Sequence, residues 1–152
     1  MQPVRFTTLS ATKPPKPSVN KSVDTAVHSR YNLNIVFNTI TPLLIAYEPR
    51  LKLNTNYCTR YDLFSEKENT LFGRRRKDIP FLSLVLQKNY VGLYFMPVYF
   101  DPELKKSLSN TLRVMLKGKS CFHLTHIDDA LVRQLKSLLR AGYKLYQKND
   151  WL

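Results

Sequence analysis

An amphipathic stripe near the C-terminus constrains the fold more than any other part of the chain. Between Leu131 and Tyr146, apolar residues recur at the spacing of a helix that lies with one face against a core. Asp128 and Asp129 stand where the helix dipole is positive, and Thr125, three residues before Asp128, suggests a variant capping box. We therefore expect a docked C-terminal helix. Its buried stripe comprises Leu131, Val132, Leu135, Leu138, Leu139, Gly142, Tyr143 and Tyr146.

Several β-rich apolar runs predict a mainly antiparallel sheet. Residues 57–64 alternate between apolar and polar positions, as a strand does. Residues 81–87 and 90–95 are separated by a short polar break, which predicts a tight hairpin. Residues 120–124 are expected to form a short closing strand before the last helix.

Two further helices complete the expected architecture. One begins near Ser29 and is stopped by Pro49, and the other begins at Asp101 and ends at Gly118. Residues 65–78 are polar and are expected to form a solvated, mobile loop. This order of elements predicts an α+β fold, with helices packed on one face of a mainly antiparallel sheet.

The length and composition indicate one domain with a basic tail. Residues 29–152 are long enough to bury a core, whereas residues 1–28 are rich in proline and lysine and are expected to be a disordered basic tail. No apolar run reaches the roughly 18 residues of a membrane span. Two cysteines in an ordinary composition fit reduced thiols, so we expect a cytoplasmic protein.

The charge balance points to an anionic partner. Lysine and arginine number 24 against 11 aspartate and glutamate, a formal net charge of +13. Such a field attracts nucleic acid, anionic lipid or an acidic protein. Two groups of basic residues are candidates for binding nucleic acid, although each also fits an ordinary solvated surface. They are Arg74, Arg75, Arg76 and Lys77 in the expected loop, and Arg133, Lys136, Arg140 and Lys144 on the polar face of the last helix.

Cys121, His123 and His126 lie close enough in sequence to suggest a metal site, since thiolate and imidazole are good ligands for zinc or iron. A fourth ligand is missing, however, and His126 lies beyond the strand. We therefore expect no metal ligands and no cofactor, with Cys121 a small buried residue. No nucleophile signature or glycine-rich phosphate loop is present, so no catalytic residue is assigned and we expect no enzyme.

Two motifs resemble the YdhG-like family of small bacterial domains of unknown function. The first is the run Lys-Asn-Tyr-Val-Gly-Leu-Tyr-Phe-Met-Pro-Val-Tyr at 88–99, followed by Pro-Glu-Leu at 102–104, and the second is Leu-Lys-Gly-Lys-Ser-Cys-Phe at 116–122. The similarity extends from Tyr31 to the C-terminus. It implies a compact cytoplasmic α+β domain with no established enzymatic activity. Some members of the wider family have been likened to frataxin, an iron-binding chaperone.

Together these observations predict a small non-enzymatic binding or interaction domain whose ligand and oligomeric state are open. The expected ligand surface joins the predicted hairpin to the closing strand through Tyr90, Tyr94, Lys119, Ser120 and Phe122. Non-specific nucleic-acid binding is one alternative. Frataxin-like iron handling is another, and the basic helices disfavour it because iron prefers carboxylate oxygens or imidazoles.

Overall fold

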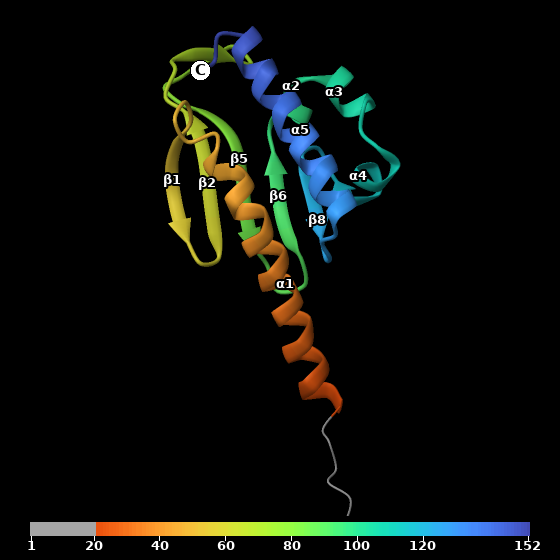
Figure 1. The fold of residues 1–152 in the computed structure, drawn as a ribbon. Helices are drawn as coiled ribbons and strands as arrows, with labels where there is room; N and C mark the ends of the chain where they lie inside the picture. Colours follow the sequence, from red (N-terminus) through yellow and green to blue (C-terminus); the bar gives the residue numbers. More distant parts are fainter. Residues whose placement is uncertain (1–20) are drawn as a thin grey trace, which may run out of the picture.

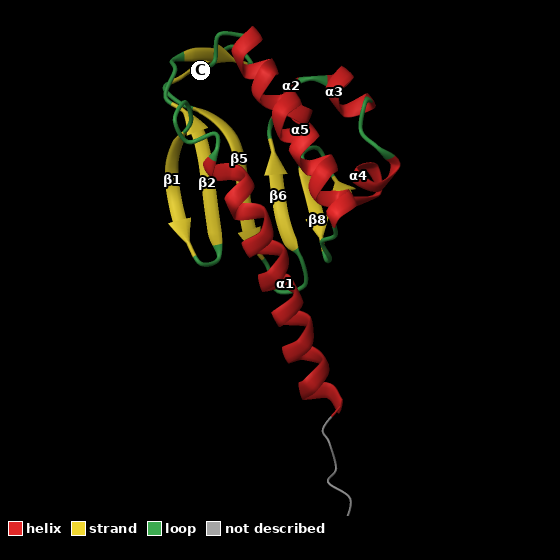
Figure 2. Ribbon diagram, viewed as in Figure 1, coloured by secondary structure: helices red, strands yellow, loops and turns green. Residues whose placement is uncertain are grey.

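The structure, a computed structural model, describes the backbone of residues 21–152 and the side chains of residues 29, 30 and 32–152. It has the expected α+β class, with helices packed against an antiparallel sheet (Figures 1 and 2). Most of the expected tail, residues 1–20, lies outside the described residues. Helix α1 begins at Lys21, so the part of the expected tail from residue 21 onward is helical, and ordered structure starts earlier than Ser29.

The main sheet has six strands in the order β1-β2-β5-β6-β8-β7. The predicted hairpin of residues 81–87 and 90–95 is confirmed as β5 and β6, in which Leu84 lies opposite Leu93. The closing strand is also confirmed, and it pairs with β6. The strands are β1 (Lys52–Tyr57), β2 (Arg60–Ser65), β5 (Ile79–Leu86), β6 (Val91–Phe95), β7 (Leu116–Lys117) and β8 (Cys121–Leu124).

The two long helices, α1 (Lys21–Ile45) and α5 (Asp129–Lys148), lie over the same face of this sheet (Figure 2). The Tyr47 ring after α1 contacts both Phe81 of β5 and Tyr143 of α5, at centroid distances of 6.1 and 5.2 Å. Phe81 also packs edge-on against Tyr146 at 5.0 Å. No helix in the described part of the chain covers the opposite face, which we call the open face.

Alternation along the strands separates the two faces. Leu84, Leu93 and Phe122 pair across three strands and are fully buried on the helix face. Their neighbours point the other way, so Tyr94 and Cys121 lie on the open face and are only half-buried.

Helix α5 has the predicted buried stripe. Leu131, Leu135, Leu138, Leu139, Gly142 and Tyr146 are buried, whereas Val132 and Tyr143 are half-buried at its edges. The expected capping box from Thr125 does not form. Asp128 is itself the N-cap, because its carboxylate accepts a hydrogen bond directly from the Leu131 amide at 2.7 Å.

Two segments fold back where a simpler path was expected. Residues 57–64, expected as one strand, are instead the turn and second arm of the β1–β2 hairpin. The sequence did not show this, because side-chain alternation alone cannot reveal a reversal of the chain. The expected loop of residues 65–78 contains a second hairpin, β3 (Asn69–Leu71) with β4 (Arg74–Arg76). Its turn at Phe72 and Gly73 uses positive φ angles of 50° and 73°, which glycine adopts without strain.

The helix expected from Asp101 to Gly118 is divided into α3 (Pro102–Lys106) and α4 (Asn110–Met115). The break follows from side chains that compete for backbone groups: the Ser107 hydroxyl donates to the Leu104 carbonyl, and the Ser109 hydroxyl accepts from the Leu112 amide as a new N-cap. A further short helix, α2 (Pro97–Phe100), follows β6. Among the described residues, no helix has the length and apolar character needed to cross a bilayer.

Candidate functional site

The structure brings most of the predicted ligand surface to one side of the molecule. Tyr90 and Tyr94 lie on the open face or its rim, half-buried, while Lys119 is exposed and Ser120 half-buried in the turn before β8. The prediction is wrong for Phe122, which is fully buried against the helices. Side chains alternate along β8, so Phe122 faces the helices while its neighbours Cys121 and His123 face the open side.

Aromatic rings cover the centre of the open face. The Tyr90 ring stacks on the His123 ring with centroids 3.7 Å apart and planes 11° from parallel. A Cβ atom at Gly92 would lie 3.1 Å from the Tyr94 ring and 3.4 Å from the Tyr90 ring. The glycine therefore lets both tyrosine rings lie close against the sheet.

The thiol beside these rings is not activated. Burial raises the pKa of Cys121, and the hydrogen bond with Tyr94 opposes that rise only in part. Burial also raises the pKa of Tyr94, so both groups are neutral at pH 7. The His123 ring stacks on the Tyr90 ring, and His126 lies exposed in the segment between β8 and α5. Across residues that the structure describes, no three His, Cys, Asp or Glu side chains are grouped to hold a metal ion.

A second aromatic group lies where the β3–β4 hairpin meets α2. Phe72, at the tip of the hairpin, is 74 % exposed, and its ring lies 5.5 Å from that of Tyr99 and 5.8 Å from that of Phe100. The Lys119 ammonium lies 5.4 Å from the centre of the Tyr99 ring, within the range of a cation–π contact. Sequence reasoning missed Phe72 because it assigned the segment to a loop. The only signal in the sequence was an aromatic residue directly before a glycine.

The basic residues predicted in this segment flank Phe72. Arg74, Arg76 and Lys77 are exposed, and they have no acidic side chain within ion-pair distance among the described residues. Arg75 instead pairs with Glu68 at 2.5 Å. We define the aromatic–basic surface as Phe72, Arg74, Arg76, Tyr99 and Lys119.

Two hollows connect the aromatic–basic surface to the open face. One, of about 450 Å³, is lined by residues that include Phe72, Tyr99 and Pro80. The other, of about 190 Å³, lies over β2 and β5 and also includes Pro80. Its lining reaches Ser83, which lies opposite Tyr94 in the sheet, so the surface continues from the hairpin to the central rings.

The second predicted basic group is not part of this surface. Arg133, Lys136, Arg140 and Lys144 are all exposed along the outer side of α5, on the helix-covered side of the sheet. They form a separate strip. The two groups of basic residues predicted as candidates for nucleic-acid binding therefore lie on two different surfaces.

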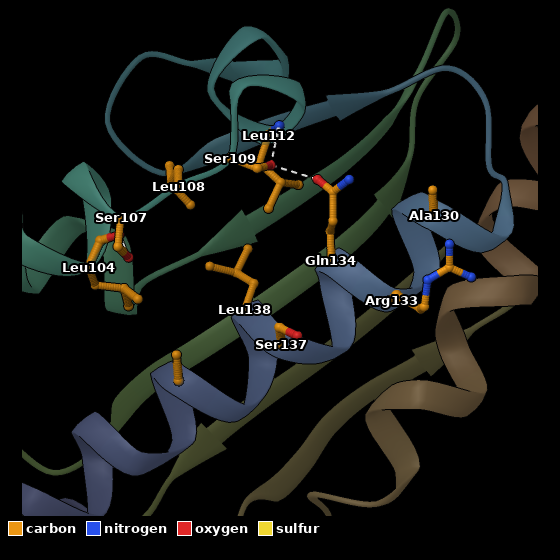
Figure 3. Close-up of a pocket in the computed structure, with 11 residues that line it drawn as sticks. Leu104, Ser107, Leu108, Ser109, Leu112, Ala130, Arg133, Gln134, Ser137 and Leu138 are labelled. Atoms are coloured by element: carbon orange, nitrogen blue, oxygen red, sulfur yellow. Dashed lines mark hydrogen bonds between the residues drawn. The ribbon is translucent and has the colours of Figure 1, made fainter.

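A third hollow, of about 490 Å³, separates α3 and α4 from α5 (Figure 3). Leucines from both sides line it, together with Arg133 and Gln134 of α5. Sequence reasoning did not predict it, since it arises from the break between α3 and α4.

Comparison with protein-family models, with curated proteins and with solved structures gave no match for the chain. The fold and site define an α+β domain with one open sheet face and an exposed aromatic–basic surface at its end. Function is therefore inferred from the geometry and charge of this chain.

Proposed function

We propose that this protein is a non-enzymatic binding domain whose ligand is single-stranded nucleic acid, held on the aromatic–basic surface. One observation carries the proposal: the Phe72 and Tyr99 rings lie side by side on the surface, with the Lys119 ammonium 5.4 Å from the centre of the Tyr99 ring and with Arg74 and Arg76 on β4, the strand that follows Phe72. Bases stack on exposed rings while neighbouring cations bind the backbone phosphates, and this combination suits single strands of any sequence.

The backbone at Phe72 adds support. Its φ of +50° is the left-handed conformation, which is costly for a bulky residue and more typical of asparagine, aspartate or glycine. The same residue exposes most of its ring to solvent. An unfavourable conformation that presents an apolar ring is typical of a functional position.

The open face offers a path for a longer strand. From Phe72 the surface runs through the hollows at Pro80 to Tyr94 and the Tyr90 ring. Arg60 lies along this path, where its guanidinium is half-exposed and bonds to Asp62 at 2.7 Å. A strand on this path would therefore meet aromatic rings at both ends.

The sequence motifs and the charge of the chain also bear on its family and on iron handling. The motifs at 88–104 and 116–122 favour a YdhG-like domain of the bacterial cytoplasm. Frataxin-like iron handling is disfavoured by the neutral Cys121 thiol and by the exposed lysine and arginine of α5.

The test is a fluorescence anisotropy titration with a labelled oligothymidylate at several salt concentrations. Phe72→Ala and Tyr99→Ala should each weaken binding about tenfold, because one stacked base contributes about 1–3 kcal/mol. Arg74→Gln should lower the salt dependence between about 50 and 200 mM. Arg140→Gln is the matched control, since it removes the same charge from the separate strip on α5.

Equal effects of Arg74→Gln and Arg140→Gln, with no effect of Phe72→Ala, would reduce the interaction to general charge attraction and overturn the site. Vesicles with anionic lipids provide the second comparison. Binding to vesicles that depends on Phe72, without binding to the oligonucleotide, would instead assign the surface to a membrane.

A further inference from the structure

The pocket on the helix side of the molecule contains residues that the aromatic–basic surface does not use. It lies between α5 and the segment formed by α3 and α4, and its volume of about 490 Å³ falls within the 300–1,000 Å³ typical of small-molecule sites. Figure 3 shows side chains from both walls directed toward the space between them. The pocket is therefore a candidate ligand site of its own.

The floor of the pocket is aliphatic. Leu104, Leu108 and Leu112 line one wall, and Leu138 of α5 points toward them from the other (Figure 3). Leu108, Leu112 and Leu138 retain 6, 4 and 5 % exposure, more than the other buried apolar residues of the core. These leucines are thus the part of the core that opens onto the pocket. No aromatic ring is among the described residues that line it.

One end of the pocket is polar and positive. The Ser109 hydroxyl donates to the Gln134 side-chain oxygen at 2.6 Å, which links α4 to α5 across that end (Figure 3). Arg133 lies one residue before Gln134, is exposed and has no acidic partner within the described part of the chain. Figure 3 shows Arg133 at the rim of the pocket, beyond Gln134 and turned away from the leucines. An exposed arginine at the rim can turn toward the charged group of an anion whose aliphatic tail lies on the leucine floor.

We propose that this pocket binds a small aliphatic carboxylate, with the carboxylate on Arg133 and the alkyl chain over Leu108, Leu112 and Leu138. The guanidinium presents two parallel N–H donors that match the two oxygens of a carboxylate. The net charge of +13 disfavours a cationic ligand at the same place. Burial of the alkyl chain against leucine supplies the remaining affinity.

Isothermal titration calorimetry with decanoate tests the proposal. Decanoate should bind, whereas decanol, which lacks the charge, and butyrate, which lacks the long chain, should each bind at least tenfold more weakly. Arg133→Gln should weaken decanoate about tenfold, because a charge-assisted hydrogen bond contributes about 1.5–3 kcal/mol. Arg140→Gln, on the same helix but outside the pocket, is the matched control and should bind normally.

Filling the pocket provides an independent arm. Ala141→Leu should abolish decanoate binding, and Ser137→Leu, at an exposed position of the lining, repeats the test if Ala141→Leu does not fold. Both variants should bind the oligothymidylate normally, which separates this site from the proposed nucleic-acid surface. Equal binding of decanol and decanoate, unchanged binding in Arg133→Gln, or absence of decanoate binding to the unaltered protein would each overturn the proposal.

Discussion

Replacing Gly142 by alanine probes the packing of α5 on the sheet most directly. Gly142 is buried where the helix crosses the end of β6. A Cβ atom there would lie 2.7 Å from Cγ of Pro97 and closer still to Cζ of Phe95. Carbon atoms pack best at about 3.5–4.0 Å, so the added methyl group overlaps both rings.

Neither ring can move away at low cost. Phe95 is fully buried and packs edge-on against Phe81 at 5.4 Å, and the Pro97 ring is fixed to its own backbone at the start of α2. Overpacking of this kind costs about 3 kcal/mol at the upper end of its usual range. Alanine recovers about 1 kcal/mol through its higher helix propensity. We therefore expect Gly142→Ala to lower the free energy of unfolding by about 2 kcal/mol.

Urea denaturation monitored by circular dichroism measures this loss, and the melting temperature should fall by about 4–8 °C. Ala141→Gly is the matched control, because it reverses the propensity term at the neighbouring position without a clash. It should cost about 1 kcal/mol. A Gly142→Ala protein as stable as the unaltered one would refute the close contact between α5, Phe95 and Pro97.

Three further predictions concern the same core and the open face. Leu135→Ala should lower the free energy of unfolding by about 2–5 kcal/mol, because Leu135 is fully buried, whereas Lys136→Ala should change it by less than about 0.5 kcal/mol; urea denaturation of both variants checks this. Tyr146→Phe should cost about 1–2 kcal/mol in the same assay, since it removes a buried hydrogen bond to a backbone carbonyl of β5. Iodoacetamide at pH 8 should modify Cys121 more slowly than the exposed Cys58, as read by mass spectrometry, because burial raises the pKa of Cys121 and so lowers its thiolate fraction; equal rates would contradict the burial.

The local pattern of the sequence was sufficient for several elements. The stripe from Leu131 to Tyr146 and the paired runs that became β5 and β6 were predicted correctly, because helical and strand periodicity are properties of neighbouring residues. The α+β class followed from their order along the chain. The same pattern did not distinguish one strand from a hairpin at Cys58, or a loop from a hairpin at Phe72, since a reversal leaves side-chain alternation unchanged.

For the candidate sites, too, the sequence predicted some features and the tertiary structure decided the others. Composition alone was enough to predict an anionic partner, because the net charge can be counted without knowing the fold. Only the tertiary structure decided that Phe122 faces the helices, and that Arg74 and Arg133 lie on different surfaces. It also brought Phe72, Tyr99 and Lys119 together from three separate segments. Such contacts depend on strand pairing and helix docking, which the spacing of residues along the chain does not encode locally.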